Sequence, residues 1–169
     1  MEEEHINWSS FRKRITVNRP LNQVYGAWAI PEKLQTWFLE KAAYTTKDGK
    51  TIEPKEQVKK GDHFTWKWHN WDFEEKGEVL MANLHDRIAF TFGPGGNVYI
   101  QLKPSKNGTE VELVQEKIPQ DEQSKMNIFV GCATGWTFWL TNLKAWLEHG
   151  ITLHATGLAQ SETTDLVNS

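Results

Sequence analysis

The chain has 169 residues, and its 38% hydrophobic and 12% aromatic content is enough to build the core of one domain. Its 19 basic and 22 acidic side chains give a net charge of -3, which excludes the strongly basic surface that nucleic acids or anionic membranes attract. No apolar run approaches the roughly 20 residues of a membrane span, so we expect neither a nucleic acid partner nor integral membrane association.

The cysteine content and the N-terminus both favour a cytoplasmic protein. Cys132 is the one cysteine, so no disulfide can form within the chain, as is usual in a reducing compartment. The first ten residues, MEEEHINWSS, are acidic, whereas a signal peptide begins with basic residues and continues with an apolar run. We therefore expect a cytoplasmic location.

The first 38 residues predict one strand followed by two short helices. Residues 11–17 alternate imperfectly between apolar and polar side chains, as a half-buried strand does. Pro20 suits the first turn of a helix, because its missing N–H has no partner there. The apolar residues that follow share one helical stripe: Leu21, Val24, Tyr25 and Trp28. Pro31 restarts the pattern, so a second short helix follows a kink.

Between about residue 41 and residue 116 the signals are strands and turns only. Turn sequences rich in Gly and Asn lie at 47–50, 93–97 and 106–109. The segments between them are rich in β-branched and aromatic residues, and their short connections imply antiparallel neighbours. We expect strands at 64–68, 73–84, 87–92, 98–102 and 111–114.

The C-terminal part predicts one long helix and a polar tail. Gly150 ends the helical pattern as a C-terminal cap would. We expect residues 1–150 to form a single domain and residues 151–169 to be a polar, flexible tail. Within the helix, at about 122–149, apolar residues recur every three or four positions: Phe129, Cys132, Trp136, Trp139, Leu140, Leu143, Trp146 and Leu147.

The aromatic strand HFTWKW explains how these elements pack. Phe64, Trp66 and Trp68 point to one face of the strand, where they would expose roughly 600 Å² of apolar surface if nothing covered them. The apolar stripe of the long helix is the best cover in the chain. The sequence therefore predicts an α+β fold in which a curved antiparallel sheet wraps around the long C-terminal helix, with two short helices after the first strand.

Three separated motifs resemble a known family. The order of elements resembles the helix-grip fold of the START-like superfamily (SRPBCC, Bet v 1-like). ITVNRPLNQVYGAWAIPEKLQTWF, at 15–38, is similar to the opening signature of the family of activator of heat shock protein 90 ATPase homologues. GEVLMANLHDRIAFTF, at 77–92, resembles the paired strands of that family, and GWTFWLTNLKAWLEHG, at 135–150, resembles its closing helix. The likeness covers nearly the whole chain.

Ten aromatic or aliphatic side chains are candidates for the lining of a ligand cavity between the sheet and the long helix. A bent sheet around a straight helix leaves a tapering gap, and many members of the resembled superfamily bind apolar ligands there. The same side chains would equally form a filled core, so both interpretations stay open. The candidates are Trp37, Phe38, Trp66, Trp68, Phe73, Phe90, Tyr99, Phe129, Trp136 and Leu140.

Four other residues bear on this gap. Gly131 and Gly135, one helical turn apart, either let the helix approach the sheet or leave room for a ligand. We expect Trp71, near a hairpin tip, to fold back over the mouth of the sheet. Glu75 would share the inward face with Phe73. Because an unpaired inward carboxylate is costly, this position indicates a functional group, a bulge or a different register, and of these we favour the bulge.

The sequence contains little that indicates catalysis. His63 and His85 each adjoin an aspartate, but neighbouring residues on a strand point to opposite faces and cannot form a dyad. The chain has no zinc-site spacing and no phosphate loop, and GPGGN lacks the spacing of a dinucleotide fingerprint. We therefore expect no catalytic residue, no metal and no cofactor.

Three hypotheses about function follow. The first, which we favour, is non-enzymatic binding of a hydrophobic small molecule, a lipid or an aromatic metabolite, between sheet and helix. The second, implied by the family resemblance, is a chaperone-associated module. The third is a cyclase-like enzyme, which would need polar groups inside the cavity. We expect the protein to be a monomer or a weak dimer.

Overall fold

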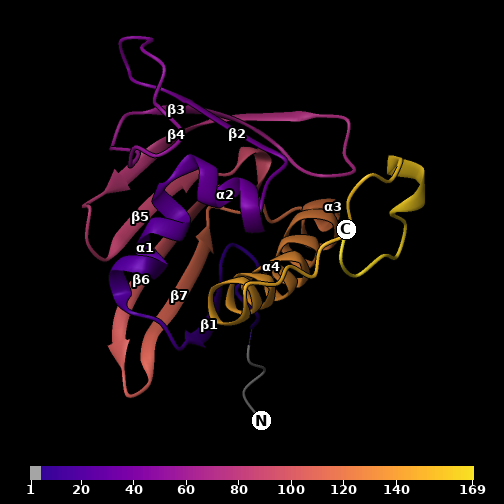
Figure 1. Ribbon diagram of the computed structural model, residues 1–169. Helices are drawn as coiled ribbons and strands as arrows, with labels where there is room; N and C mark the ends of the chain where they lie inside the picture. Colours follow the sequence, from indigo (N-terminus) through magenta and orange to yellow (C-terminus); the bar gives the residue numbers. More distant parts are fainter. Residues whose placement is uncertain (1–4) are drawn as a thin grey trace.

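The computed structural model describes residues 5–169, which form one antiparallel sheet and a set of helices (Figure 1). The strands are β1 (Phe11–Val17), β2 (Lys41–Thr45), β3 (His63–Lys67), β4 (Glu74–Ala82), β5 (Arg87–Thr91), β6 (Asn97–Ser105) and β7 (Gly108–Glu116). The helices are α1 (Leu21–Ala29), α2 (Pro31–Trp37), η1 (Gly93–Gly95), α3 (Glu122–Ser124), η2 (Lys125–Val130), α4 (Gly131–His149) and η3 (Gln160–Glu162).

The sheet has seven strands in the order β1-β7-β6-β5-β4-β3-β2, and every neighbouring pair is antiparallel. The five strands expected from residue 64 onward are all present, with ends shifted by a few residues. The sequence pattern did not single out β2 (Lys41–Thr45), which forms one edge of the sheet beside β3. The fold class is confirmed as a helix-grip α+β fold.

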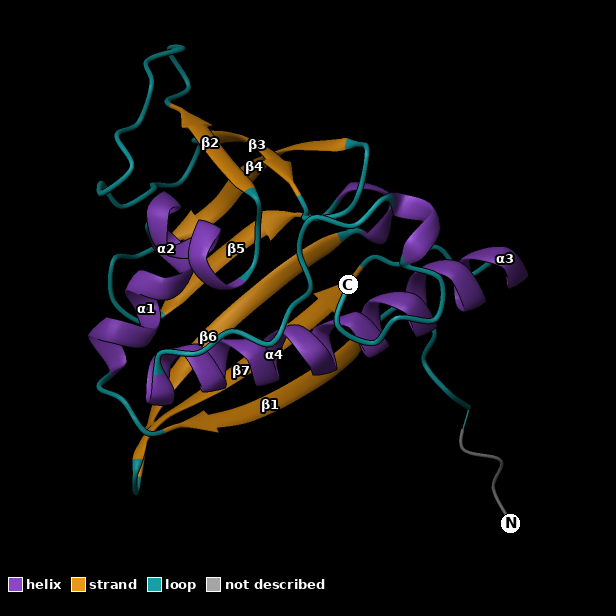
Figure 2. Ribbon diagram, turned by 45° about the vertical axis from the view of Figure 1, so that its right-hand side comes forward, coloured by secondary structure: helices purple, strands orange, loops and turns teal. Residues whose placement is uncertain are grey.

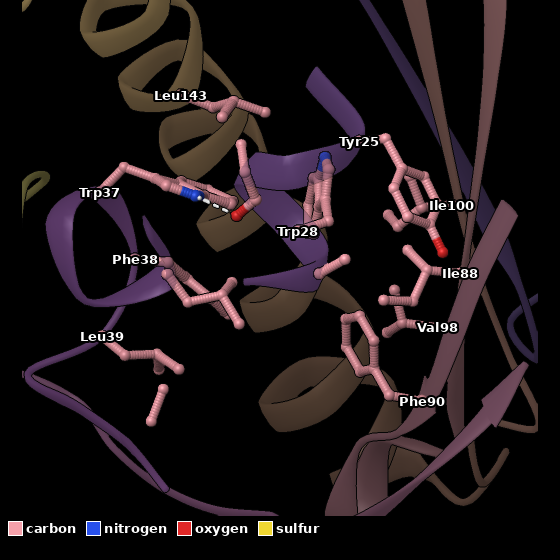
Figure 3. Packing of buried hydrophobic residues seen from close by; sticks show 14 of the residues in the cluster. Tyr25, Trp28, Trp37, Phe38, Leu39, Ile88, Phe90, Val98, Ile100 and Leu143 are labelled. Atoms are coloured by element: carbon pink, nitrogen blue, oxygen red, sulfur yellow. Dashed lines mark hydrogen bonds between the residues drawn. The ribbon is translucent and has the colours of Figure 1, made fainter. Parts of the chain in front are cut away.

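The three main helices lie on one face of the sheet, as Figure 2 shows. Helix α4 crosses in front of β7 and β1, α1 lies over β5, β6 and β7, and α2 contacts β2. The indole of Trp28 lies against Trp37 at 4.9 Å and against Trp136 at 6.0 Å between ring centroids, so one tryptophan joins all three helices. Figure 3 shows Trp28 beside Trp37, with the Trp37 Nε1 donating to the carbonyl of Ala27 at 2.9 Å.

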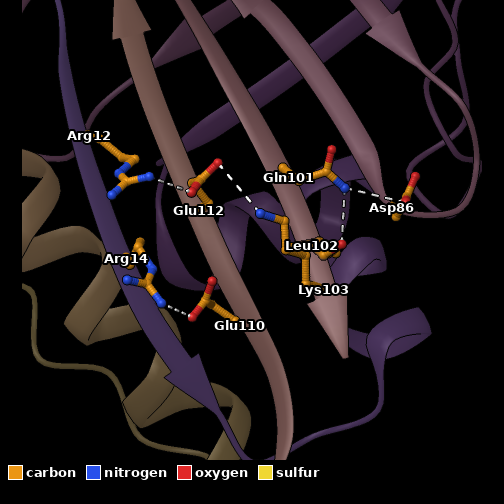
Figure 4. Close-up of polar contacts among 8 residues, drawn as sticks. All are labelled: Arg12, Arg14, Asp86, Gln101, Leu102, Lys103, Glu110 and Glu112. Atoms are coloured by element: carbon orange, nitrogen blue, oxygen red, sulfur yellow. Dashed lines mark hydrogen bonds and ion pairs between the residues drawn. The ribbon is translucent and has the colours of Figure 1, made fainter. Parts of the chain in front are cut away.

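The opposite face of the sheet carries charged side chains. Arg12 pairs with Glu112 at 3.3 Å, and Arg14 pairs with Glu110 on the same two strands, β1 and β7 (Figure 4). Lys103 of β6 lies 4.0 Å from Glu112. Exposed pairs of this kind contribute about 0 to 1 kcal/mol each, so they identify the solvent face of the sheet more than they stabilise it.

The long C-terminal helix is continuous from 122 to 149 but is not α-helical throughout. The α3 turn passes into the π-helical segment η2, which leads directly into α4. Asp121 caps the start by accepting a hydrogen bond from the Ser124 amide at 3.0 Å. Gly150, at φ 68°, ends the helix in the left-handed conformation, as the sequence predicted. Short π segments inside helices are frequent at functional sites.

The C-terminal tail follows a path fixed by side-chain hydrogen bonds. The buried Asn142 accepts a hydrogen bond from the Leu153 amide at 2.6 Å, and Asn70 donates to the Ala155 carbonyl at 2.9 Å. Asn70 also accepts from the Leu158 amide at 3.0 Å. The tail is thus held against α4 and the loop between β3 and β4. Its flexibility stays a prediction.

No helix within residues 5–169 is long and apolar enough to cross a membrane.

Candidate functional site

The centre of the space between sheet and helices is filled with side chains. Six of the ten candidate residues lie in this core, where none is more than 4% exposed: Trp37, Phe38, Trp66, Phe90, Trp136 and Leu140. Their rings contact one another closely; Phe38, for example, lies 5.8 Å from Trp66 and 5.2 Å from Trp136 between centroids. For these six residues the structure favours the filled-core interpretation over a cavity.

A cavity of about 460 Å³ opens at one end of this core. It lies where the hairpin of β3 and β4, the turn after β5, and the first half of the long helix come together. This volume is within the range of small-molecule sites. Phe73, in its wall, is 50% exposed, so the cavity opens to solvent. We call it the aromatic cavity; it is lined by Trp68, Trp71, Phe73, Glu75, Phe92, Pro94, Gly95, Asn127, Ile128, Cys132, Gly135, Trp139 and Ser169.

Trp68 forms the boundary between the filled core and the aromatic cavity. Its ring lies 5.8 Å from Phe38 in the core, and 5.9 Å from Phe73 and 6.0 Å from Phe92 in the cavity wall. Trp71 lies 6.4 Å from Phe73 and lines the cavity, as expected of a side chain that folds over the mouth. Of the ten candidates, Trp68 and Phe73 therefore line the open part of the gap.

Glu75 points into the aromatic cavity, and the expected bulge at this position is wrong. The ladder between β3 and β4 is regular, with Glu75 directly opposite the buried Trp66. The irregularity in β4 lies further along, between Val79 and Met81. Burial raises the pKa of the Glu75 carboxyl. Within residues 5–169, its side chain has neither a hydrogen-bond partner nor an ion-pair partner.

The inner wall of the cavity adjoins a buried polar network. Gln115, fully buried on β7, accepts a hydrogen bond from Trp136 Nε1 at 2.9 Å and donates to the Gly95 carbonyl at 2.9 Å. The two bonds tie the sheet to α4 and to the turn η1. Burial raises the pKa of the Cys132 thiol in the same wall, and a thiol kept neutral in this way is a poor nucleophile.

The two helix glycines face open space. A Cβ atom added at Gly131 or Gly135 would meet no atom within 4 Å. Close approach of helix and sheet therefore does not require glycine at either position. Gly135 lines both the aromatic cavity and a second groove on the other side of α4, so its missing side chain leaves space where the two hollows meet.

Two of the ten candidates, Tyr99 and Phe129, lie outside the cavity, so their predicted place in its lining is wrong. Tyr99 points to the charged outer face of the sheet, because its neighbours Val98 and Ile100 on β6 occupy the buried inner positions. Phe129, in the π segment, packs against Trp8 at 5.0 Å and Phe11 at 5.4 Å. The π geometry turns it away from the stripe that a regular α-helix would have shared with Trp136.

A second groove, of about 860 Å³, lies on the other side of α4. Phe129 belongs to it, together with Phe138 and the tail residues Leu166 and Val167. Thr134, Thr137 and Thr141 also line this groove, but most of its wall is apolar. We regard the aromatic cavity as the candidate site, because it lies between sheet and helix and holds a partly buried charge.

Several residues of the aromatic cavity were missed by sequence reasoning. Phe92 continues the inward alternation of Phe90, so its position could have been found from the strand pattern. Asn127 and Ile128 could not have been found, because a π segment follows no α-helical stripe. Across residues 5–169, no three His, Cys, Asp or Glu side chains gather as metal ligands would.

The family model described as Activator of Hsp90 ATPase homolog 1-like protein matches residues 18–148. The chain belongs to this family. The match covers the chain from the end of β1 to the last turn of α4, and so includes the whole aromatic cavity except Ser169. No curated protein matches the chain.

Several solved structures of other proteins have the same fold as this chain. A protein from Staphylococcus saprophyticus is 25% identical, with a TM-score of 0.69 over 87% of this chain and 97% of that one. The Aha1 dimer from Colwellia psychrerythraea is 15% identical, with a TM-score of 0.66 over 83% of this chain and 97% of that one. DynU16, described as a putative protein in the dynemicin biosynthetic locus, is 17% identical, with a TM-score of 0.65 over 85% of this chain and 49% of its own.

Proposed function

We propose that the protein binds a hydrophobic small molecule in the aromatic cavity without altering it chemically. The observation that carries this proposal is Gly135. A glycine inside a helix costs about 1 kcal/mol relative to alanine, yet a side chain here would meet nothing within 4 Å. The residue therefore costs helix stability without serving the packing, and what it leaves is space beside the rings of Trp68 and Trp139.

The chemistry of the wall supports the same proposal. Trp68, Trp71, Phe73, Phe92 and Trp139 offer aromatic faces, and a ligand that covered them would remove apolar surface from water. Because the adjoining core is already filled, a ligand can bind at this end without any rearrangement of the domain. Binding to the native state alone would also raise the melting temperature.

The test compares two leucine substitutions that lie one helical turn apart, with N-phenyl-1-naphthylamine as a neutral fluorescent probe. Gly135→Leu adds an aliphatic side chain in the wall of the aromatic cavity, where Gly135 lies beside Trp139 and Cys132, so we expect it to weaken probe binding about tenfold or more. Gly131→Leu is the matched control, because Gly131 lines only the groove on the other side of α4. It should change probe affinity less than about twofold. Both variants should be as stable as the parent or more so, since leucine is a better helix former than glycine by roughly 0.6 to 1 kcal/mol.

Native mass spectrometry of protein purified without detergent gives an independent readout. The proposal fails if the probe shows no saturable binding and no hydrophobic compound accompanies the protein. It also fails if Gly135→Leu and Gly131→Leu bind the probe equally.

The family description supports a second candidate function, association with an Hsp90 chaperone. Under this hypothesis the protein would be retained on immobilised Hsp90 and would change its ATPase rate. A pull-down that never recovers the chaperone, together with an unchanged ATPase rate, would dismiss it.

A further inference from the structure

Glu75 is the one charged side chain in the wall of the aromatic cavity, which contains no Lys, Arg or His. Register places it opposite Trp66 on the inward face of the sheet. Its neighbours on β4, Glu74 and Lys76, are exposed on the other face. Nothing in the cavity wall therefore balances the charge of this carboxylate.

The backbone is shaped to admit the carboxylate at this point. A Cβ atom on Gly93 would lie 2.5 Å from Glu75 Oε1, so a side chain at position 93 would displace the carboxylate from its present place. Gly93 also has φ +49°, a conformation that L side chains rarely adopt. The turn after β5 thus leaves open the place that the Glu75 carboxylate occupies.

The partly buried Glu75 carboxylate lowers the stability of the folded protein, because no cation in the described part of the chain pairs with it. Removing an ionised carboxylate from water is unfavourable unless a partner compensates. No such partner is found among residues 5–169, so only solvent in the open cavity compensates the partly buried charge, and a bound cation would compensate it further. The surrounding rings limit its chemistry, because the faces of Trp and Phe attract cations and a nearby carboxylate adds to that attraction.

We propose that the aromatic cavity selects ligands in which a hydrophobic body carries an organic ammonium group, and that Glu75 pairs with this group. The proposal rests on the proposed function, since it names the ligand class for the same cavity. The ammonium group would lie between the Glu75 carboxylate and the nearest aromatic faces, while the apolar body would cover the remaining rings. The aromatic walls and the apolar body of the ligand would cover part of the ion pair, which makes the pairing stronger than on an exposed surface.

The experiment uses three ligands of equal length: 4-phenylbutylamine, 4-phenylbutanol and 4-phenylbutanoate. Each displaces N-phenyl-1-naphthylamine from the full chain at pH 7.5 and physiological ionic strength. We expect the amine to bind about tenfold more tightly than the alcohol, and the carboxylate to bind most weakly. A tenfold difference corresponds to about 1.4 kcal/mol.

Matched variants assign the preference to one carboxylate. Glu75→Gln keeps the shape of the side chain and removes its charge, so it should weaken amine binding about tenfold and change alcohol binding less than about twofold. Glu74→Gln makes the same change in net charge on the exposed face of the same strand and should alter neither affinity. A thermal melt of Glu75→Gln should show a fold at least as stable as the parent, because the substitution removes an unpaired charge.

The outcomes separate this inference from the proposed function. If the alcohol binds as tightly as the amine, or if Glu75→Gln leaves the amine affinity unchanged, the ammonium preference is overturned while the cavity still binds ligands. Tightest binding by the carboxylate would also overturn it, since Glu75 would then act as a protonated hydrogen-bond donor. If the naphthylamine probe and all three ligands fail to bind, the proposed function falls and the inference falls with it.

Discussion

Gln115 shows how much of the site geometry depends on one side chain. It is fully buried, and its amide connects the indole of Trp136 on α4 with the carbonyl of Gly95 in the turn η1. These two contacts align the helix and the turn that form opposite walls of the aromatic cavity. Loss of this amide would cost more stability than the loss of two average hydrogen bonds, because two buried polar groups would be left without partners.

Gln115→Leu should therefore destabilise the protein by about 2 to 4 kcal/mol, since it strands the Trp136 N–H and the Gly95 carbonyl away from water. Denaturant unfolding followed by fluorescence measures this change. Gln57→Leu, at an exposed loop position, is the control and should change stability by about 0.5 kcal/mol or less. Equal effects of the two substitutions would contradict the role given to Gln115.

Residue positions were predictable from the sequence wherever strand alternation was the only influence. The inward set Phe64 and Trp66 follows from alternation, and so does the outward position of Tyr99 once Val98 and Ile100 are seen to be the buried pair. Glu75 was harder. Alternation alone placed it inward, but the cost of an inward carboxylate argued for a bulge. Sequence rules of stability fail most readily at functional sites, where a local cost can be retained.

The position of the tail, residues 151–169, could not be predicted from the sequence. Its composition is polar, and it is held by single amide side chains, Asn142 and Asn70, that bind backbone groups rather than by an apolar stripe. Composition detects a stripe but not a few well-placed amides. The π segment is a second example, because it changes the helical repeat without any marker in the sequence.

The tail should loosen when the pH falls, because two histidines hold it. His154 lies 5.0 Å from His69 between ring centroids, and its Nδ1 lies 3.1 Å from the Asn142 amide nitrogen. Burial lowers the pKa of both rings below the ordinary 6.5; for His69, Glu40 partly opposes this change and Lys67 adds to it. Stability that depends on neutral rings is fully present above 6.5 and is lost as the pH falls through the folded-state pKa.

Hydrogen exchange with mass spectrometry, corrected for the intrinsic pH dependence of exchange, measures this loosening. Between the ordinary pKa of 6.5 and the lower folded-state pKa, protection of residues 151–160 should fall by up to about tenfold per pH unit for each proton that the loosened tail binds and the held tail does not. His154→Gln cannot titrate and should show a much flatter profile, whereas His85→Gln, on an exposed loop, should behave like the parent. Equal protection of the parent tail at pH 7.5 and pH 5 would refute the prediction.

At the scale of the whole molecule, the fold follows from two apolar surfaces that require each other. The aromatic inner face of the sheet and the stripe of the long helix were both visible in the sequence, and so was their order along the chain. The aromatic cavity was not predictable in the same way. Whether a gap is filled depends on how individual rings pack, and here Phe38, Trp66 and Trp136 fill the centre and leave one end open.

Because this core is continuous from α1 to α4, we expect residues 5–150 to unfold as a single cooperative unit. Far-UV circular dichroism reports the sheet and helices, and tryptophan fluorescence reports the core. The two signals should give coincident thermal midpoints. Separate midpoints would mean that the β2–β4 part of the sheet melts independently of α4, against the prediction of a single domain.

The last residue of the tail has a practical consequence. Ser169 lines the aromatic cavity and also the groove on the other side of α4. A purification tag fused after it would begin at the rim of both hollows, where its own side chains would compete with any added compound. Ligand assays on this protein therefore call for a cleaved tag. A histidine tag is a poor choice, since its side chains become cations below about pH 6.5 and would then imitate the ligands that Glu75 is proposed to select.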